Sequence, residues 1–164
     1  MPYLIANAKV NNRTESLAYK VYRPKQIEFV DLTTNSGMRT YVRSLCFILA
    51  KAVHDIIPEA KTYIEHAVSR GYFFDIEIDG RTDAVSNEQL AAIKARMQEI
   101  VAHDHPFISK EEETEKVVEL FRSHNLKDKA TLLETSDFLY SRYFELDGYI
   151  NYFYGSLMPS TGYI

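Results

Sequence analysis

The residues of this chain that could carry out chemistry are few: one cysteine and five histidines among 164 residues. Cys46 falls in an apolar stretch of predicted helix with no histidine placed to act as its base. We therefore interpret it as a small buried hydrophobe and not as a nucleophile. His103 and His105 are two residues apart and would point to different faces of a helix. The remaining histidines are scattered, at His54, His66 and His124. None of these spacings predicts a metal site or a catalytic triad.

Motifs of nucleotide-dependent enzymes and of hydrolases are absent from the sequence. It contains no GxGxxG, GxxxxGK[ST], GxSxG or CxxC pattern. Phosphoryl transfer needs a loop that cradles phosphate and side chains that hold the metal. We therefore expect no catalytic residue, no metal and no cofactor within this segment.

The composition is that of an ordinary globular domain, with 46% hydrophobic and 26% charged residues. The formal charge is −4 and the Lys and Arg residues are scattered, so no basic face for nucleic acid is evident. No apolar run approaches the roughly 20 residues of a membrane helix, and no signal-peptide pattern is present. A single cysteine suits a reducing compartment. We expect a cytoplasmic protein that does not enter a membrane.

The elements that must position any site are predicted by hydrophobic periodicity and turn signals, and they indicate an α+β fold. Three short strands, too few to bury a core alone, are expected at 3–10, 17–22 and 27–32. A long central helix follows over 39–57. Its inward stripe would consist of Leu45, Leu49, Ala52, Val53 and Ile56. Two strands at 63–68 and 72–78 then flank a turn at Arg70-Gly71.

Two capping boxes predict the starts of two further helices. Ser86 with Gln89 opens a helix over 87–103, whose inward residues would be Leu90, Ile93, Met97, Ile100 and Val101. Ser109 with Glu112 opens the other, which places the acidic run 111–113 in its first turn, where the helix dipole favours negative charge. Asp147-Gly148 predicts the tight turn of a C-terminal hairpin between 138–146 and 149–154. One face of that hairpin would hold Phe138, Tyr140, Phe144, Tyr149, Asn151 and Phe153.

Two motifs are more specific than these elements: GYFFDIEI at 71–78 and MPSTGYI at 158–164. Between and before them, in order, stand VRSLCFILAKAV, IIPEAK, HPFISKEEE and DKATLL. Together these segments resemble the second additional domain of threonyl-tRNA synthetases (the tRNA SAD domain), which hydrolyses mischarged tRNA. The preceding ANAKVNNRTESLAYKV and IEFVDL resemble the second half of the ubiquitin-like TGS module. The resemblance thus divides the chain into a partial TGS remnant at 1–34 and an editing-like domain at 35–164.

The editing site of that family pairs two histidines on its first helix, at i and i+4, with a cysteine and a histidine near its end. An acidic residue and a lysine accompany them. At the matching positions the present chain has Arg43, Phe47, Asn151, Phe153 and Leu157. Only the lysine of the family's site is kept, as Lys129.

These substitutions remove the chemistry that the family's site performs. Phenylalanine and leucine have no lone pair and no titratable proton, and arginine stays protonated at neutral pH. We therefore expect a degenerate site that is packed shut, in preference to a new catalytic site. Arg43 and Lys129 could together hold an anion such as a phosphate. An ion pair with a neighbouring Asp or Glu is the interpretation that we prefer for them.

The aromatic ending GYINYFYGSLMPSTGYI also resembles bacterial proteins in which such domains precede a P-loop kinase of the uridine kinase family. That resemblance implies a parent that phosphorylates a nucleoside with ATP and Mg²⁺, from which this chain is an excised front segment. Our main hypothesis is a non-catalytic accessory or regulatory domain, with the kinase domain of the same chain and a small-molecule or tRNA-like ligand as partners. The alternatives are an aminoacyl-tRNA deacylase with a rebuilt site and a structural spacer without a ligand.

Overall fold

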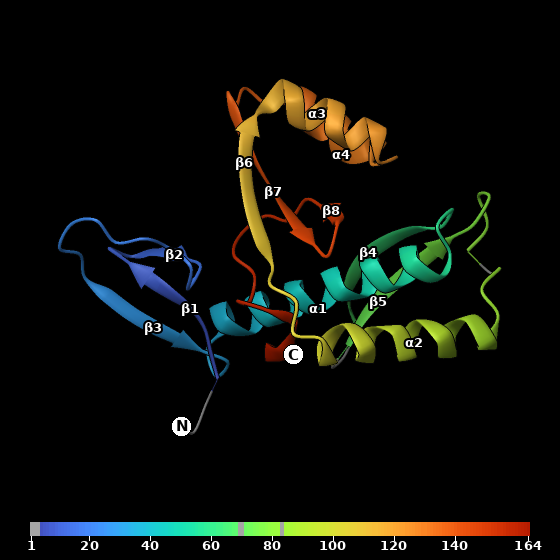
Figure 1. The fold of residues 1–164 in the computed structure, drawn as a ribbon, viewed down its shortest axis with the longest axis horizontal. Coiled ribbons are helices and arrows are strands. Elements are labelled where there is room, and N and C mark those ends of the chain that lie inside the picture. Colours follow the sequence, from blue (N-terminus) through green and yellow to red (C-terminus); the bar gives the residue numbers. More distant parts are fainter. Residues whose placement is uncertain (1–3, 69–70, 83) are drawn as a thin grey trace.

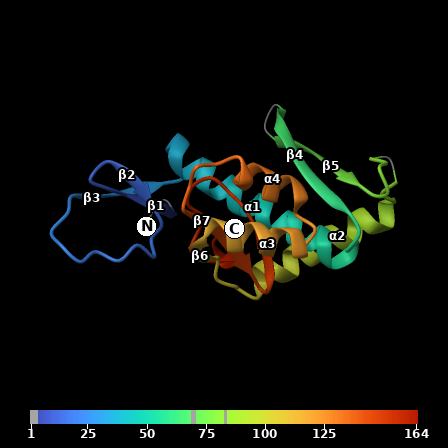
Figure 2. The ribbon, with the colours of Figure 1, turned by 90° about the horizontal axis from the view of Figure 1, so that it is seen from above.

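The computed structural model describes residues 4–68, 71–82 and 84–164. Within these ranges the chain forms four α-helices and three small antiparallel sheets, so the predicted α+β class is confirmed (Figure 1). The sheet of the first three strands lies at one end of the molecule, and the hairpin that follows the long helix lies at the other (Figure 2). None of the helices in the described ranges is long and apolar enough to cross a membrane.

The first sheet consists of β1 (Ile5–Val10), β2 (Arg13–Glu15) and β3 (Ile27–Asp31), in the order β2-β1-β3. Asn11 and Asn12 have φ values of 49° and 64°, as a tight turn between β1 and β2 requires. The strand predicted at 17–22 is wrong. Ser16 ends β2 there, because its carbonyl accepts from the Tyr19 N–H and its hydroxyl from the Ala18 N–H, which starts a turn.

This small sheet is supported by the start of the long helix α1 (Asn35–Ile56). The Asn7 side chain, fully buried, donates from Nδ2 to Thr40 Oγ1 at 2.7 Å. Gly37 allows α1 to lie close to the end of β3, since a Cβ at this position would lie 2.0 Å from the carbonyl oxygen of Asp31. The sheet therefore depends on α1 for its packing, as its size led us to expect.

Helix α1 forms the centre of the main core. Thr34 caps its first turn, where Thr34 Oγ1 accepts from the Gly37 N–H at 3.0 Å. Its fully buried hydrophobic side chains are Phe47, Ile48, Ala52 and Val53. The inward position predicted for Ile56 is wrong, since Ile56 is 37% exposed. The helix ends at that residue, and the next one, Ile57, is buried in its place.

The hairpin β4 (Lys61–Val68) and β5 (Gly71–Glu77) confirms the predicted strand pair. The residues 69–70 of its turn and the side chains of 65–68, His66 included, lie outside what the structure describes. Helix α2 (Asn87–Ala102) lies alongside α1 (Figure 1) and starts with the predicted capping box of Ser86 and Gln89. Ile93 and Ile100 are buried as expected, but Leu90 in the first turn is 45% exposed, so its predicted inward position is wrong.

The second predicted capping box is wrong. Residues Ile108–Glu113 form strand β6, which pairs with β7 (Tyr140–Leu146), and helix α3 (Thr114–Ser123) begins only at Thr114. Partners on β7 hold the acidic run in strand conformation: Arg142 Nη2 donates to Glu111 at 3.1 Å and the Tyr143 hydroxyl donates to Glu112 at 2.7 Å. The charges that we assigned to a helix dipole are thus cross-strand partners.

A fourth helix, α4 (Lys127–Glu134), was not predicted. It packs against α3, and the pair forms a second core with β7 and β8 (Tyr149–Asn151). The turn at Asp147-Gly148 is as predicted, with φ values of 46° and 77°. The predicted hairpin face is wrong at its outer end, where Phe138 and Tyr140 are 67% and 61% exposed. They lie beyond the part of β7 that pairs with β8, and Tyr140 pairs with Glu113 of β6 instead. The chain then passes to a short 3-10 turn, η1 (Thr161–Tyr163).

Candidate functional site

The predicted site positions lie around the middle of α1 and the segment that follows β8. Phe47 is fully buried and Leu157 is 2% exposed, and both belong to the main core. The rings of Phe47 and Phe153 are 5.1 Å apart between centroids and tilted by 51°. The Phe107 ring also packs against Phe47, with centroids 5.8 Å apart. Where a catalytic imidazole or thiol would need water, this structure therefore has closely packed hydrocarbon.

Asn151 and Arg43 are polar members of the set, and each binds the backbone of the same C-terminal segment. Asn151 Oδ1 accepts from the Tyr152 N–H at 2.8 Å. Arg43 donates from Nη1 to the carbonyl oxygen of Ser156, and Gly155, with a φ of 107°, lets the backbone pass close to the guanidinium. Burial, and then the charge of Arg39, lower the pKa of Arg43. Arg43 forms no ion pair with a carboxylate of the described residues, contrary to the interpretation that we preferred.

Lys129, the lysine kept from the family's site, lies on α4 with its side chain 34% exposed. Its Nζ is 3.6 Å from Asp128 of the same helix, a neighbouring ion pair of little strength. The interpretation that we preferred, an ion pair with a neighbouring Asp or Glu, therefore holds for Lys129 but not for Arg43.

Arg43, Lys129, Asn151 and Phe153 all line one cleft of about 1150 Å³. The cleft lies between α1 and β4 on one side and α4 with the β7–β8 turn on the other. Phe47 and Leu157 do not line it. The structure thus combines a packed apolar centre with an open cleft beside it, which the expectation of a site packed shut did not foresee.

The cleft carries more positive than negative charge. Its lining has six Lys or Arg residues, namely Arg39, Arg43, Lys51, Lys61, Lys127 and Lys129, against three Asp residues, namely Asp55, Asp128 and Asp147. The whole chain, in contrast, has a formal charge of −4. Sequence reasoning missed four of these cations, Arg39, Lys51, Lys61 and Lys127, because only the fold brings α1, β4 and α4 around one cleft. For Arg39, the i, i+4 spacing to Arg43 on the predicted helix was a usable signal.

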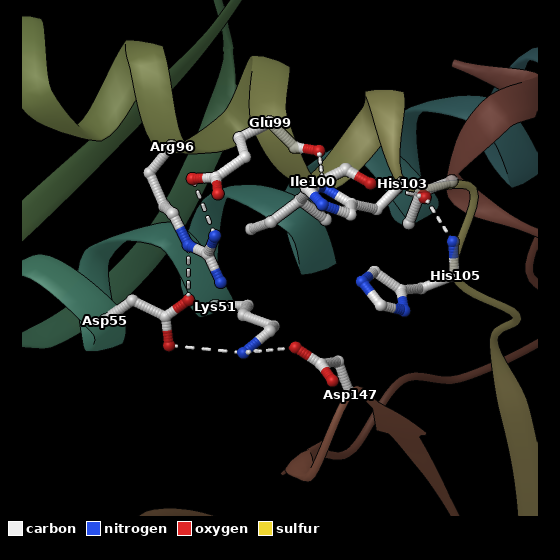
Figure 3. Close-up of polar contacts among 9 residues, drawn as sticks. Lys51, Asp55, Arg96, Glu99, Ile100, His103, His105 and Asp147 are labelled. Atoms are coloured by element: carbon white, nitrogen blue, oxygen red, sulfur yellow. Dashed lines mark hydrogen bonds and ion pairs between the residues drawn. The ribbon is translucent and has the colours of Figure 1, made fainter.

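Lys51 is the most buried of these cations, at 5% exposed, and it forms ion pairs with two carboxylates of the same cleft. Its Nζ lies 3.2 Å from Asp55 and 3.5 Å from Asp147 (Figure 3). Asp55 also accepts from Arg96 Nε at 2.8 Å, which ties α1 to α2. Lys51 is therefore paired with two carboxylates, whereas the partner of Arg43 is a neutral backbone carbonyl.

Among the described side chains, the histidines and the cysteine give no catalytic pair. His103 and His105, expected on different faces of a helix, have stacked rings 5.7 Å apart (Figure 3). The reason is that α2 ends before them and Asp104 has a φ of 51°, which reverses the chain. Cys46 is only half-buried, and burial raises the pKa of its thiol, which disfavours the thiolate. Among the described residues no three His, Cys, Asp or Glu side chains are grouped to hold a metal ion.

Comparison of the sequence with known proteins finds similarity to threonine–tRNA ligases. Over 166 residues the chain is 28% identical to the threonine–tRNA ligase of Syntrophomonas wolfei, an alignment that covers 98% of this chain and 26% of that protein. Over 120 residues it is 30% identical to the threonine–tRNA ligase of Rubrobacter xylanophilus, which covers 73% of this chain and 18% of the ligase. The threonine–tRNA ligase of Desulforamulus reducens is 28% identical over 156 residues, 94% of this chain and 24% of the ligase. This chain is related to a segment of threonine–tRNA ligases. No family model matches it.

The chain spans about a quarter or less of the length of these relatives. Their name describes the activity of whole ligases, and it does not by itself assign an activity to this segment. None of the three is named a kinase, so the uridine kinase parent stays a prediction.

Proposed function

We propose that this chain is a non-hydrolytic binding domain whose cleft accepts the nucleotide end of an RNA, or a related anionic nucleotide. The observation that carries the proposal is a cleft of about 1150 Å³ with an excess of cations on a protein of net negative charge. Electrostatic attraction would concentrate an anion at this cleft and not over the rest of the surface.

Aromatic side chains in the cleft suit the bases of such a ligand. The lining includes Tyr63, Tyr72, Tyr149, Tyr152, Phe153 and Tyr154. Tyr154 is 89% exposed, so its ring face is available for stacking. Stacking of bases on aromatic rings contributes about 1–3 kcal/mol per base and tolerates different sequences. Cations for phosphates and rings for bases are the two components that single-stranded RNA binding uses.

Binding without hydrolysis follows from the residues at the packed centre. Phe47, Phe153 and Leu157 offer no group that could take a proton from water. Burial raises the pKa of Cys46, the single thiol of the chain, and none of the hydrogen bonds of the described histidines is to Cys46. A bound ester would therefore meet no activated thiol. The two imidazoles that line the cleft already have structural contacts: the His54 ring stacks on Tyr149 at 4.9 Å, and His124 Nδ1 lies 2.9 Å from the Leu120 carbonyl oxygen.

The experiment is titration of the protein with a short fluorescent RNA that ends in CCA, followed by anisotropy at two salt concentrations. We expect binding that weakens as salt rises, and about tenfold weaker binding for Lys129→Ala. The matched control is Lys116→Ala, an exposed lysine outside the cleft, which should bind like the unmodified protein. Binding that ignores salt, or that falls equally in both variants, would contradict the proposal, and no binding at all would favour a spacer.

A second candidate, an aminoacyl-tRNA deacylase with a rebuilt site, is favoured by the names of the relatives. In that case Lys129 would orient the ester or the water. Incubation with mischarged tRNA tests it directly, since a deacylase would release the amino acid faster than spontaneous hydrolysis does.

We also propose that the domain serves as an accessory or regulatory segment of a uridine kinase-like parent, which would transfer phosphate from ATP, with Mg²⁺, to a nucleoside. The aromatic C-terminal motif supports this proposal, and the related ligases support a synthetase-like setting instead. The adjoining gene sequence decides between them: a Walker loop downstream of Ile164 indicates the kinase, and a ligase catalytic domain refutes it.

A further inference from the structure

We propose that a second, smaller cavity next to the cleft binds a phosphate group, which Arg39 and Arg43 hold together. The cavity has a volume of about 370 Å³ and lies between β2, the first turns of α1 and the segment 154–156. The inference rests on the proposed function only in assigning the phosphate to a nucleotide or an RNA.

The two arginines form a pair of like charges without a counterion. They are four residues apart on α1, so they lie on the same face of the helix, and both line both cavities. Neither forms an ion pair with a carboxylate of the described residues. Like charges at this spacing destabilise a helix. Burial, and after it the charge of Arg39, lower the pKa of Arg43. A bound dianion would offset the repulsion between the two guanidinium groups.

The rest of the lining also suits an anion. No Asp or Glu in the described part of the chain lines this cavity, although Asp and Glu make up 23 of the 164 residues. Its other side chains that can donate hydrogen bonds are Thr14, Asn35, Ser36, Thr40, Tyr154 and Ser156. A cavity with two guanidinium groups, several donors and no carboxylate would repel a metal ion and accept a phosphate.

Gly155 is a positioning residue for this site. Its φ of 107° favours glycine, and a Cβ there would lie 3.0 Å from both Cζ and Nη1 of Arg43. Arg43 uses one N–H for the Ser156 carbonyl, and a guanidinium has five, so donors remain for a ligand. The segment thus holds the guanidinium in place at the boundary between the two cavities without neutralising its charge.

The experiment follows the side-chain Nε–H signals of arginine by NMR while the intact chain is titrated with inorganic phosphate. We expect saturable shifts for Arg39 and Arg43, and at least about tenfold weaker binding for Arg39→Ala and Arg43→Ala. Gly155→Ala should weaken binding as well, although it removes no charge. Arg23→Ala, an exposed arginine that lines neither cavity, is the matched control and should bind normally. Equal binding by the double variant Arg39→Ala/Arg43→Ala, or equal loss in the Arg23 control, would overturn the inference.

Three further ligands identify the source of the phosphate. If adenosine 5′-monophosphate binds at least tenfold more tightly than adenosine, and Arg39→Ala removes this difference, the ligand is a nucleotide with a terminal phosphate. If CCA-ending RNA without a terminal phosphate binds Arg39→Ala more weakly than the unmodified protein, the site holds a backbone phosphate of the RNA. If the RNA fails to bind but inorganic phosphate still requires both arginines, the proposed function fails and the phosphate site stands. Equal affinities of nucleotide and nucleoside would refute the phosphate site alone.

Discussion

Replacement of Phe47 by alanine is the sharpest test of the packed centre. The Phe47 side chain is fully buried, with neighbouring ring centroids at 5.1 Å for Phe153, 5.8 Å for Phe107 and 6.0 Å for Tyr149. Removal of a buried phenylalanine ring costs about 3–5 kcal/mol, from lost burial and from the cavity that remains. Three rings pack against Phe47, and we expect them to fill only part of that space, so we expect a value near the middle of the range.

The assay is urea unfolding followed by circular dichroism, together with a thermal melt. For a domain of this length each kcal/mol lowers the melting temperature by about 2–4 °C, so Phe47→Ala should melt roughly 8–16 °C earlier. The matched control is Phe138→Ala, since Phe138 is 67% exposed and its loss should change the unfolding free energy by about 0.5 kcal/mol or less. Phe47→His should also destabilise, by about 1–3 kcal/mol, because it buries an imidazole in an apolar core. If Phe47→Ala cost no more than the control, the centre would be loosely packed and the reasoning refuted.

Three further predictions concern single side chains. Burial raises the pKa of Tyr149 to about 12. The stability that its protonated form contributes is therefore present below pH about 10 and lost as the pH rises to about 12. In an alkaline titration followed by absorbance at 295 nm, Tyr149→Phe should have one fewer tyrosine that ionises near pH 12. Lys51→Met should lower the unfolding free energy by about 1–3 kcal/mol in urea, since it leaves Asp55 and Asp147 without their shared cation. Gly37→Ala should cost about 1–3 kcal/mol or more, because its Cβ would overlap backbone 2.0 Å away.

Each of these predictions has a control and a contrary result. Tyr154→Phe removes a tyrosine that is 89% exposed, and an unchanged alkaline titration of Tyr149→Phe would contradict the assigned burial. Lys20→Met removes an exposed lysine outside both cavities, and an equal loss in the two lysine variants would show that the Lys51 ion pairs add nothing. Met38→Ala changes the exposed neighbour of Gly37, so equal stability of these two variants would argue against a close contact between helix and sheet.

Local signals predicted the parts of the fold that local interactions determine. The positive φ values at Asp147 and Gly148 and the capping box of Ser86 and Gln89 require only neighbouring residues, and both are present. The strand at Ile108–Glu113 could not be foreseen in this way, since its polar sequence is held by pairing with β7 some 30 residues later. The capping box that we predicted from Ser109 and Glu112 does not form, because these residues pair with β7 instead.

The candidate site shows the same division between local and long-range information. The resemblance supplied Arg43, Phe47 and Phe153, and their residue types alone indicated lost chemistry. The cleft arises because α4 faces α1 across the β7–β8 turn, an arrangement that no local pattern encodes. Lys51 and Lys61 therefore line the same cleft only because of the tertiary fold.

The most direct test of the central claim measures hydrolysis and binding on one sample. Mischarged tRNA is added to the intact chain, bound RNA is followed by anisotropy and released amino acid is counted over time, with Lys129→Ala in parallel. We predict bound RNA, weaker binding in the variant, and release no faster than in buffer. Release well above the buffer rate that disappears in Lys129→Ala would contradict the account and establish a deacylase.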